Sequence, residues 1–309
     1  MPTPVIIDCD PGIDDAVALA MAAASPELDL VAVTTTYGNV GIEKTTANAL
    51  KLLDWLGRDT RVFMGADRAL LGRPIDASQY HGETGLEAPG LAPSRRQPEA
   101  QGAILFLIDE LMRRAGPITL VALGPLTNIA LAMRLEPRII PRIGRIVLMG
   151  GSPDYGNDSP SAEFNLLCDP HAARIVFSSG VPIVMFGLNV THQIIATPAE
   201  MAKIRAIGNR SAALFGDMID FFRTVYVDRY GFAGAALHDP CTIAWLLRPD
   251  IFEFRDMHVD VETNEGLNFG RTVCDMWGLT EKPKTVSVAM AAKPEAFFDL
   301  LRERLARLA

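Results

Sequence analysis

Four aspartates lie close together near the start of the chain, where an apolar run gives way to a helical pattern: Asp8, Asp10, Asp14 and Asp15. Carboxylates this close repel one another and are costly to bury. A chain that gathers them beside a hydrophobic strand therefore needs a hard cation to neutralise them. The segment predicts a metal site with oxygen ligands.

Three further loops carry side chains suited to polar ligands, and each follows a predicted strand. They are Thr35-Thr-Tyr-Gly-Asn-Val40, Leu123-Gly-Pro-Leu-Thr-Asn128 and Met149-Gly-Gly151, the last of which leads into Gly156-Asn157 and Glu163-Phe-Asn165. Ligands of open α/β sheets bind outside the carboxyl ends of the strands. All four loops are therefore expected to meet at one edge of a sheet.

Taken in order, these motifs and His238-Asp-Pro240 closely resemble those of the inosine-uridine-preferring nucleoside hydrolase family. The resemblance runs in register from about Val5 to Pro240. It implies calcium-dependent hydrolysis of the N-glycosidic bond of ribonucleosides, purine or pyrimidine. The products would be ribose and a free nucleobase, as in nucleoside catabolism and salvage.

The same resemblance implies a role for individual residues. Ca²⁺ would be held by the carboxylates of Asp10, Asp15 and Asp239 and by the carbonyl of Leu123, and His238 would face the departing base. The ribose oxygens would be bound by Asp14, Asn39, Asn157, Glu163 and Asn165.

The expected reaction explains these residue types. As the base leaves, the ribose gains oxocarbenium character, and carboxylates around the sugar stabilise that charge mainly in the transition state. Asp10 is the predicted general base, which takes a proton from a water attacking opposite the base, as in an inverting glycosidase. His238 can donate a proton near neutral pH, so it is the predicted general acid for the leaving nitrogen.

The base pocket is predicted to include His81, Tyr226 and Tyr230. The two tyrosines are four residues apart, which places them on one face of a helix, where they can stack on a heterocycle. The segments Gly65–Pro98 and Gly150–Cys168 are longer than ordinary connections, which makes them candidates for lids or pocket walls.

Several acidic residues also have ordinary structural interpretations. Asp239 before Pro240 is typical of a helix N-cap followed by proline, as is Asp169 before Pro170. Asp8 is expected to be a structural hydrogen-bond acceptor behind the metal ligands.

The amides and Glu163 have structural alternatives as well. Asn39 and Asn157 each follow a glycine and fit turns. Glu163 and Asn165 flank the apolar Phe164, a pattern that a short strand with one buried side chain also produces.

Two other classes of function remain open from the sequence. Asp8-Cys-Asp10 after a strand is also similar to haloacid dehalogenase-type, Mg²⁺-dependent phosphatases, in which Asp8 would be the nucleophile and Asp10 the acid/base. That hypothesis lacks a clear later acidic loop and leaves Asp14 and Asp15 unexplained. The other class is a non-catalytic nucleoside- or calcium-binding protein, which a turnover assay would distinguish.

The chain between these loops alternates apolar runs with helical patterns, which predicts βαβ units. The predicted strands are Val5–Asp8, Leu28–Thr34, Arg61–Met64, Ile118–Leu123, Arg145–Met149, Pro182–Phe186, Phe254–Val261 and Thr285–Met290. The predicted helices are Asp14–Ala24, Gly41–Trp55, Glu99–Arg113, Leu126–Met133, Pro170–Ser178, Pro198–Ala206, Ala212–Val227, Pro240–Leu247 and Pro294–Leu308. We expect one α/β domain over residues 1–309: a Rossmann-like, doubly wound, mainly parallel sheet with helices on both faces.

Composition narrows the partners. The chain has 309 residues, of which 49% are hydrophobic, enough to bury one large core. Its net charge of −8 argues against nucleic acid, which binds basic surfaces. The four cysteines are far apart, with no CxxC pair, which argues against a disulfide framework or a zinc site.

No long uncharged apolar run and no signal-like segment are found, so no membrane partner and a cytoplasmic location are expected. The resemblance implies a ribonucleoside as the small-molecule partner and a homodimer or homotetramer.

Overall fold

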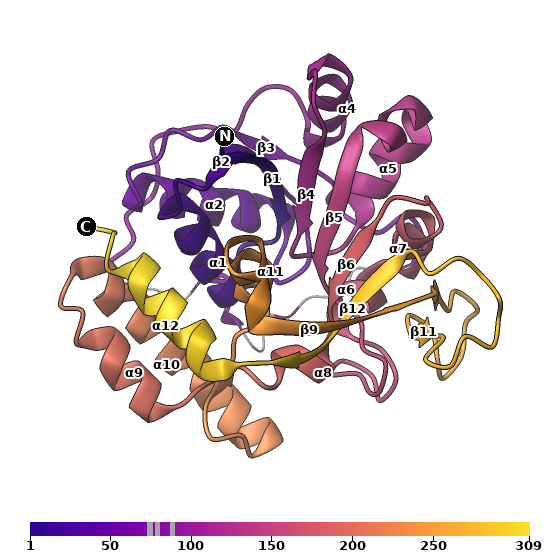
Figure 1. Cartoon of the computed structure of the whole chain (residues 1–309). Helices are drawn as coiled ribbons and strands as arrows, with labels where there is room; N and C mark the ends of the chain where they lie inside the picture. The colour runs from indigo at the N-terminus through magenta and orange to yellow at the C-terminus, as the bar shows by residue number, and fades with distance from the viewer. Residues whose placement is uncertain (73–76, 78–80, 87–89) are drawn as a thin grey trace.

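The main feature of the molecule is an eight-stranded sheet in the order β3-β2-β1-β4-β5-β6-β12-β9 (Figure 1). The computed structural model describes residues 1–72, 77, 81–86 and 90–309. Neighbouring strands are parallel, except that β9 is antiparallel to β12. The strands are β1 (Thr3–Cys9), β2 (Leu28–Thr35), β3 (Val62–Met64), β4 (Ile118–Ala122), β5 (Ile143–Met149), β6 (Ile183–Phe186), β9 (Phe252–Met257) and β12 (Val286–Ala292). The predicted mainly parallel sheet is confirmed.

Helices cover both faces of this sheet. One face carries α1 (Ile13–Ala23), α2 (Ile42–Trp55), α9 (Pro198–Arg205), α10 (Arg210–Tyr230), α11 (Pro240–Leu247) and α12 (Pro294–Leu305). The other carries α4 (Ala103–Arg113), α5 (Thr127–Leu135) and α7 (Pro170–Phe177). Shorter elements are α6 (Phe164–Cys168), α8 (Leu188–Thr191) and the 3₁₀ turns η1 (Pro137–Arg142) and η2 (Pro249–Ile251). Across the described part of the chain, no helix has both the length and the hydropathy to cross a bilayer.

Two short antiparallel pairs lie outside the main sheet. They are β7 (Ile195–Ala196) with β8 (Ala235–Ala236), and β10 (Val259–Val261) with β11 (Thr272–Cys274). The prediction of one strand over Phe254–Val261 is therefore wrong, because β9 ends at Met257 and β10 joins a different sheet. The short-strand interpretation of Phe164 is also wrong, since this residue begins helix α6.

Strand β1 shows why the parallel strands are hydrophobic without interruption. Val5 and Ile7 pack into the core under α1, whereas Ile6 packs into the core under α4 and α5. Both faces of the strand are buried, so no position between Val5 and Cys9 faces water. By the same alternation, Asp8 points to the side of α5.

The strand order reverses between β1 and β4. From β1 the chain moves outward through β2 and β3, and then returns to place β4, β5 and β6 on the other side. In doubly wound sheets, the connections that follow the two strands at such a switch point run to opposite faces of the sheet. They leave a crevice at the carboxyl ends of the strands. The acidic segment follows β1, and Leu123 follows β4.

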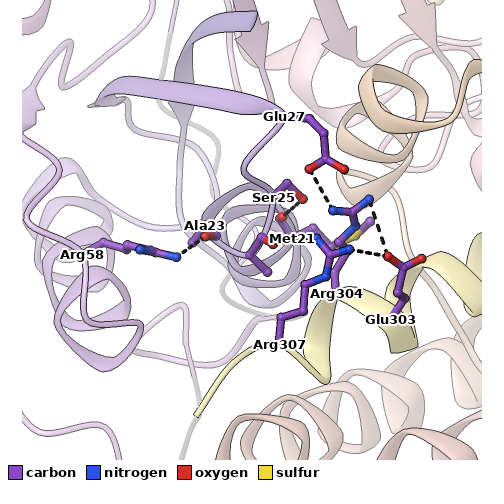
Figure 2. Close-up of polar contacts among 9 residues, drawn as sticks. Met21, Ala23, Ser25, Glu27, Arg58, Glu303, Arg304 and Arg307 are labelled. Carbon is purple, nitrogen blue, oxygen red and sulfur yellow. Dashed lines mark hydrogen bonds and ion pairs between the residues drawn. The ribbon is translucent and has the colours of Figure 1, made fainter. Parts of the chain in front are cut away.

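The C-terminal end of α1 is held by arginines from distant segments. Arg58 donates to the carbonyl of Ala23, and Arg307 on the last turns of the chain reaches the carbonyl of Ala24 (Figure 2). Arg304 of α12 forms an ion pair with Glu27 at 2.9 Å. Cations are favourable at the negative end of a helix dipole. Helix α1 is thus anchored at the end opposite its acidic N-terminus.

Candidate active site

A cavity open to solvent lies outside the carboxyl ends of the central strands. Most of the predicted site residues line it: Asp14, Asn39, His81, Leu123, Asn157, Glu163, Asn165, Tyr226, His238 and Asp239. Asp10 and Asp15 are buried and contact Asn39 in the cavity wall. The convergence that the loop positions predicted is therefore present in the structure.

Three of the predicted residues form a compact oxygen cluster. One oxygen from each of Asp14, Asp15 and Asp239 lies within 4.8 Å of the others, and all three side chains are buried. An ion with bonds of about 2.3–2.6 Å to oxygen can span this spacing. Asp10 lies beside the cluster, joined to it through Asn39, which donates to the Asp10 carboxylate at 2.6 Å and to the Asp15 carboxylate at 3.1 Å.

Two glycines make room for the Asp10 carboxylate. A Cβ atom at Gly38 would lie 2.1 Å from one Asp10 oxygen, and a Cβ at Gly124 would lie 2.3 Å from the other. Gly38 also has a φ of 154°, which side chains rarely adopt. Asp10 thus occupies a slot that only glycine permits on either side.

Burial and mutual repulsion make the cluster unfavourable without a cation. Burial and, to a smaller extent, the neighbouring Asp15 carboxylate raise the pKa of Asp14 to about 7. Burial also raises the pKa of Asp15 to about 6 and those of Asp10 and Asp239 well above their usual range. Among the described residues, one oxygen of Asp10 and one of Asp15 are buried without a hydrogen-bond partner. These features fit carboxylates arranged to bind a positive charge.

The two Asp-Pro pairs have different roles. Asp169 caps α7, with its carboxylate accepting the amide of Ala172 at 2.9 Å. Asp239 also precedes a helix with proline at its first position, but its side chain makes no cap hydrogen bond. The Asp239 carboxylate faces Asp14 and Asp15 instead.

Glu163 and Asn165 are positioned by the first turn of α6. The Glu163 side chain caps this helix by accepting the amides of Asn165 and Leu166, and it also accepts the amide of Gly151 at 2.8 Å. Asn165 donates to the carbonyl of Leu123 at 2.7 Å. Burial raises the pKa of Glu163 to about 7. Glu163 thus both caps α6 and lines the cavity.

The amide of Asn157 is also partly engaged in local structure. Its side-chain oxygen accepts the backbone amide of Phe164 at 2.9 Å. The residue is half-buried and lines the cavity. Its side-chain nitrogen is the group with which Asn157 can meet a ligand.

His238 lies in a hydrogen-bonded chain between two helices. Its Nδ1 pairs with the hydroxyl of Thr191 at 2.8 Å, and its Nε2 pairs with the hydroxyl of Tyr226 at 2.5 Å. Burial lowers the pKa of His238 well below its usual range, so the imidazole is neutral in the ligand-free protein. A neutral imidazole donates at one nitrogen and accepts at the other, which allows it to relay a proton.

His81 is fixed by a backbone contact. Its Nδ1 accepts the amide of Ile13 at 3.2 Å, and burial lowers its pKa to about 3. Its ring packs against Phe222, with ring centres 5.0 Å apart. The segment Gly65–Pro98, predicted as a lid or pocket wall, includes residues 73–76, 78–80 and 87–89, which lie outside the described residues.

The sequence reasoning missed several cavity-lining residues: Ala77, Met149, Asp158, Phe164 and Phe222. The four-residue helical spacing that predicted Tyr226 and Tyr230 also includes Phe222, which lies four residues before Tyr226 on α10. This spacing is the signal that could have identified Phe222. Tyr230 itself is absent from the cavity lining in the described residues and packs behind Tyr226, with ring centres 5.4 Å apart.

Asp8 lies on the other side of β1. It is 1% exposed, and one of its oxygens accepts hydrogen bonds from Thr34 at 2.5 Å and Asn128 at 2.8 Å. A phosphatase of the haloacid dehalogenase type needs this carboxylate as a nucleophile facing its substrate. Asp8 does not line the cavity, so the geometry does not support that alternative.

Comparisons with known proteins show the family of the chain. Residues 5–299 match the family model described as inosine-uridine preferring nucleoside hydrolase. The chain is 43% identical over 299 residues to the pyrimidine-specific ribonucleoside hydrolase RihB of Escherichia coli O17:K52:H18, which covers 97% of this chain and 96% of that protein. RihB of Shigella flexneri gives the same identity and coverage.

Solved structures of similar proteins share the fold. The purine-preferring ribonucleoside hydrolase from Gardnerella vaginalis superposes with a TM-score of 0.92 at 33% identity, covering 98% of both chains. The plant nucleoside hydrolase PpNRh1 gives a TM-score of 0.92 at 35% identity, covering 99% of both chains. The chain belongs to the inosine-uridine preferring nucleoside hydrolase family.

Proposed function

We propose that this ribonucleoside hydrolase uses a calcium ion held by the acidic cluster and that it acts on pyrimidine ribonucleosides. The observation that carries the proposal is the group of buried carboxylates Asp14, Asp15 and Asp239, with Asp10 beside it. Asp14 and Asp239 also line the cavity. These groups are acceptors only, which favours a hard ion over zinc or copper.

The proposed ligands of the ion are Asp10, Asp15, Asp239 and the carbonyl of Leu123. The unpartnered oxygens of Asp10 and Asp15 support this set, because buried carboxylate oxygens ordinarily have a partner. When bound, calcium supplies positive charge that neutralises the cluster and orients and polarises the attacking water. Asp14 belongs to the same oxygen cluster and lines the cavity, which supports the proposal that it binds a ribose hydroxyl.

In the proposed mechanism, Asp10 accepts the proton of the attacking water. Its carboxylate is held in one orientation by the amide of Asn39 and by the slot between Gly38 and Gly124. A fixed base adjacent to the anomeric carbon lowers the barrier because no reorientation is needed during the reaction. Asn157, Glu163 and Asn165 bind sugar oxygens and stabilise the oxocarbenium-like transition state.

His238 and Tyr226 are proposed to protonate the leaving base. Both line the cavity and share a short hydrogen bond. In this step the neutral imidazole first takes up a proton from solvent, and the imidazolium then passes a proton to the leaving nitrogen, directly or through the phenol hydroxyl, which returns the ring to its neutral form. Phe222 and His81 form an aromatic wall beside them. This wall is the surface proposed to hold the base ring.

The preference for pyrimidines is proposed from the names of the RihB relatives, which are more similar in sequence than the purine-preferring Gardnerella enzyme. We expect release of ribose from uridine and cytidine with kcat/KM at least about tenfold above that for inosine and adenosine. A chelator should stop turnover, and added calcium should restore it.

Assays of these four nucleosides, with and without chelator, distinguish the remaining hypotheses. Ribose release that is unaffected by chelation would contradict the metal role, and faster turnover of inosine would contradict the base preference. A protein that binds uridine without releasing ribose would be the non-catalytic binder.

We further propose a cytoplasmic homodimer or homotetramer. Leu267, Trp277 and Leu279 are 80% or more exposed in the segment around β11. Exposed large apolar side chains are typical of contact surfaces between subunits. Light scattering of the purified protein measures the subunit number directly, and a monomeric mass would contradict this part of the proposal.

A further inference from the structure

We infer that Asn128, a buried residue outside the cavity, is a positioning residue. Its side chain holds the carboxyl ends of the central strands in the arrangement that the proposed reaction needs. The inference rests on the proposed function. Asn128 is 0% exposed and is the second residue of α5. In the described part of the chain, its side-chain hydrogen bonds go to Asp8, Thr35 and Ala66 and to none of the groups proposed to contact the substrate, so an effect on turnover must act through other residues.

The Asn128 side chain joins three separate segments of the chain. Its nitrogen donates to the carboxylate of Asp8 on β1 at 2.8 Å and to the carbonyl of Thr35 on β2 at 2.9 Å. Its oxygen accepts the amide of Ala66, just after β3, at 2.8 Å. Since α5 itself follows β4, one amide connects the carboxyl ends of four strands.

Two of these segments lead to the proposed reaction centre. Asp8 is two residues before Asp10, and its carbonyl accepts the amide of Leu123 at 2.8 Å. Thr35 is four residues before Asn39, which holds the Asp10 carboxylate. A shift of the strand ends relative to one another therefore moves the general base relative to the remaining cluster.

The surroundings of Asn128 are built for an amide. Ala66 needs an acceptor, whereas the Asp8 carboxylate and the Thr35 carbonyl need donors, and only an amide side chain of this size provides both. A Cβ at Gly65 would lie 2.3 Å from the Asn128 oxygen, so the loop after β3 approaches the amide closely. The second Asp8 oxygen is buried and has no hydrogen-bond partner in the described part of the chain, which leaves Asn128 and Thr34 to fix this carboxylate.

A purely local role in α5 does not explain these contacts. The N-cap of α5 is Leu126, and it makes no side-chain cap hydrogen bond. All three Asn128 side-chain bonds leave the helix for other segments. The residue therefore does not serve as a cap for its own helix.

The chain offers a matched control in Asn209, the half-buried N-cap of α10. Its side chain makes the same set of bonds, accepting one backbone amide (Ala212) and donating to two oxygens (the carbonyls of Leu305 and Leu308). Replacing either asparagine by alanine removes three hydrogen bonds. Both variants should lose thermal stability, but only Asn128→Ala disturbs the strand ends beneath Asp10.

The experiment compares Asn128→Ala and Asn209→Ala with the unaltered protein below their melting temperatures. For Asn128→Ala we expect kcat on uridine to fall by about 10- to 100-fold with little change in KM. Its calcium dissociation constant, measured by calorimetry without substrate, should rise by about tenfold or more. Asn209→Ala should keep kcat, KM and calcium affinity within about twofold of the unaltered protein.

Equal kcat and equal calcium affinity in Asn128→Ala and Asn209→Ala, with both destabilised, would overturn the inference and leave Asn128 a structural residue only. An unaltered protein that hydrolyses no nucleoside would instead overturn the proposed function, and the calcium titration would still test Asn128. If Asn128→Ala does not fold, Asn128→Ser, which keeps a donor at this position, provides the same comparison.

Discussion

At the residue scale, the proposed site depends on a group of buried carboxylates. Burying each of them costs free energy, but together they can bind a cation. Asp10, Asp14, Asp15 and Asp239 are all buried, and burial raises the pKa of each. Until a cation binds, favourable interactions elsewhere in the folded molecule must offset the free-energy cost of burying these carboxylates. The neighbouring glycines show how closely the backbone approaches these groups. Small changes beside the carboxylates should therefore have large effects on turnover.

Gly124→Ala tests the slot around Asp10. The new Cβ would lie 2.3 Å from an Asp10 oxygen, so the carboxylate has to move. A displacement of about 1 Å at a reacting group lowers kcat by roughly 100-fold, and we expect a loss of that size. Gly116→Ala is the matched control, since nothing lies within 4 Å of its Cβ position. Steady-state kinetics on uridine should show the loss in the first variant only, and equal rates would contradict the slot.

His238→Ala tests the proposed protonation of the leaving base. A pyrimidine anion is a poor leaving group, so we expect kcat on uridine to fall by about 100-fold or more. Nitrophenolate departs without protonation, so activity on nitrophenyl riboside should fall much less. His258→Ala, a half-buried histidine paired with Asp260, serves as the control and should leave both rates unchanged. Equal losses on the two substrates in His238→Ala would argue against the acid role.

At the element scale, two helices carry much of the site. Both are held by side-chain contacts at the end that lies away from the site. Helix α1 presents Asp14 and Asp15 at its N-terminus, and arginines hold its other end (Figure 2). Helix α10 presents Phe222 and Tyr226, and Asn209 at its start also binds carbonyls at the end of α12. Helix α12 is therefore an anchor for both elements.

Arg304→Ala tests this anchoring. Arg304 is 5% exposed on α12 and pairs with Glu27 just after α1, so its loss removes packing and an ion pair at the helix contact. We expect a loss of about 1–3 kcal/mol in the free energy of unfolding. The value of kcat at 25 °C should change by less than about twofold, because the site itself is not touched.

Arg138→Ala provides the comparison for this prediction. Arg138 is exposed and pairs with Glu136 two residues away, and such surface pairs add little stability. Denaturant unfolding of the two variants should separate them. Equal midpoints for both would contradict an anchoring role for Arg304.

At the scale of the whole molecule, the sheet gathers residues from most of the chain into one cavity. The carboxyl ends of β1, β2, β4 and β5 contribute Asp14, Asn39, Leu123 and Met149, and the chain beyond β6 contributes His238 and Asp239. Stability and metal binding are linked, because an ion that binds only the folded state stabilises it. The proposed single domain over residues 1–309 further predicts one cooperative unfolding transition.

Thermal unfolding at several pH values tests this linkage. In metal-free protein the folded-state pKa of Asp14 is raised to about 7 and that of Asp15 to about 6, above the usual carboxyl value of 3.8. The folded state then holds more protons than the unfolded state, so stability is highest below about pH 4 for these groups and falls as pH rises through 7. Other groups set the acid limit, so the comparison belongs between pH 5 and pH 8.

Calcium should remove this loss, because the ion favours the ionised carboxylates. We expect the increase in melting temperature on adding calcium to grow from pH 5 to pH 8, reaching on the order of 5 °C. Magnesium at the same concentration tests the identity of the ion. A calcium effect that is constant or decreasing over this range would contradict a metal site in the acidic cluster of Asp14, Asp15 and Asp239.

Local patterns in the sequence were sufficient for the sheet and the acidic segment. Unbroken apolar runs predicted the parallel strands because both faces of those strands are covered, and the rule for strand ends predicted where the polar loops meet. The clustering of Asp8, Asp10, Asp14 and Asp15 predicted buried charge in need of a cation. These inferences depend on neighbours along the chain, which a sequence displays directly.

Tertiary structure decided how chemically identical residues differ. Asp169 and Asp239 share the same local pattern, yet only Asp169 caps its helix, and only Asp239 joins the acidic cluster. Asp8 and Asp10 are two residues apart, yet Asp8 bonds to Thr34 and Asn128 whereas Asp10 bonds to Asn39 in the cavity wall. Asn128 reaches three segments distant in sequence. Which partner a side chain meets depends on the packing of segments far apart along the chain, so local spacing alone does not determine it.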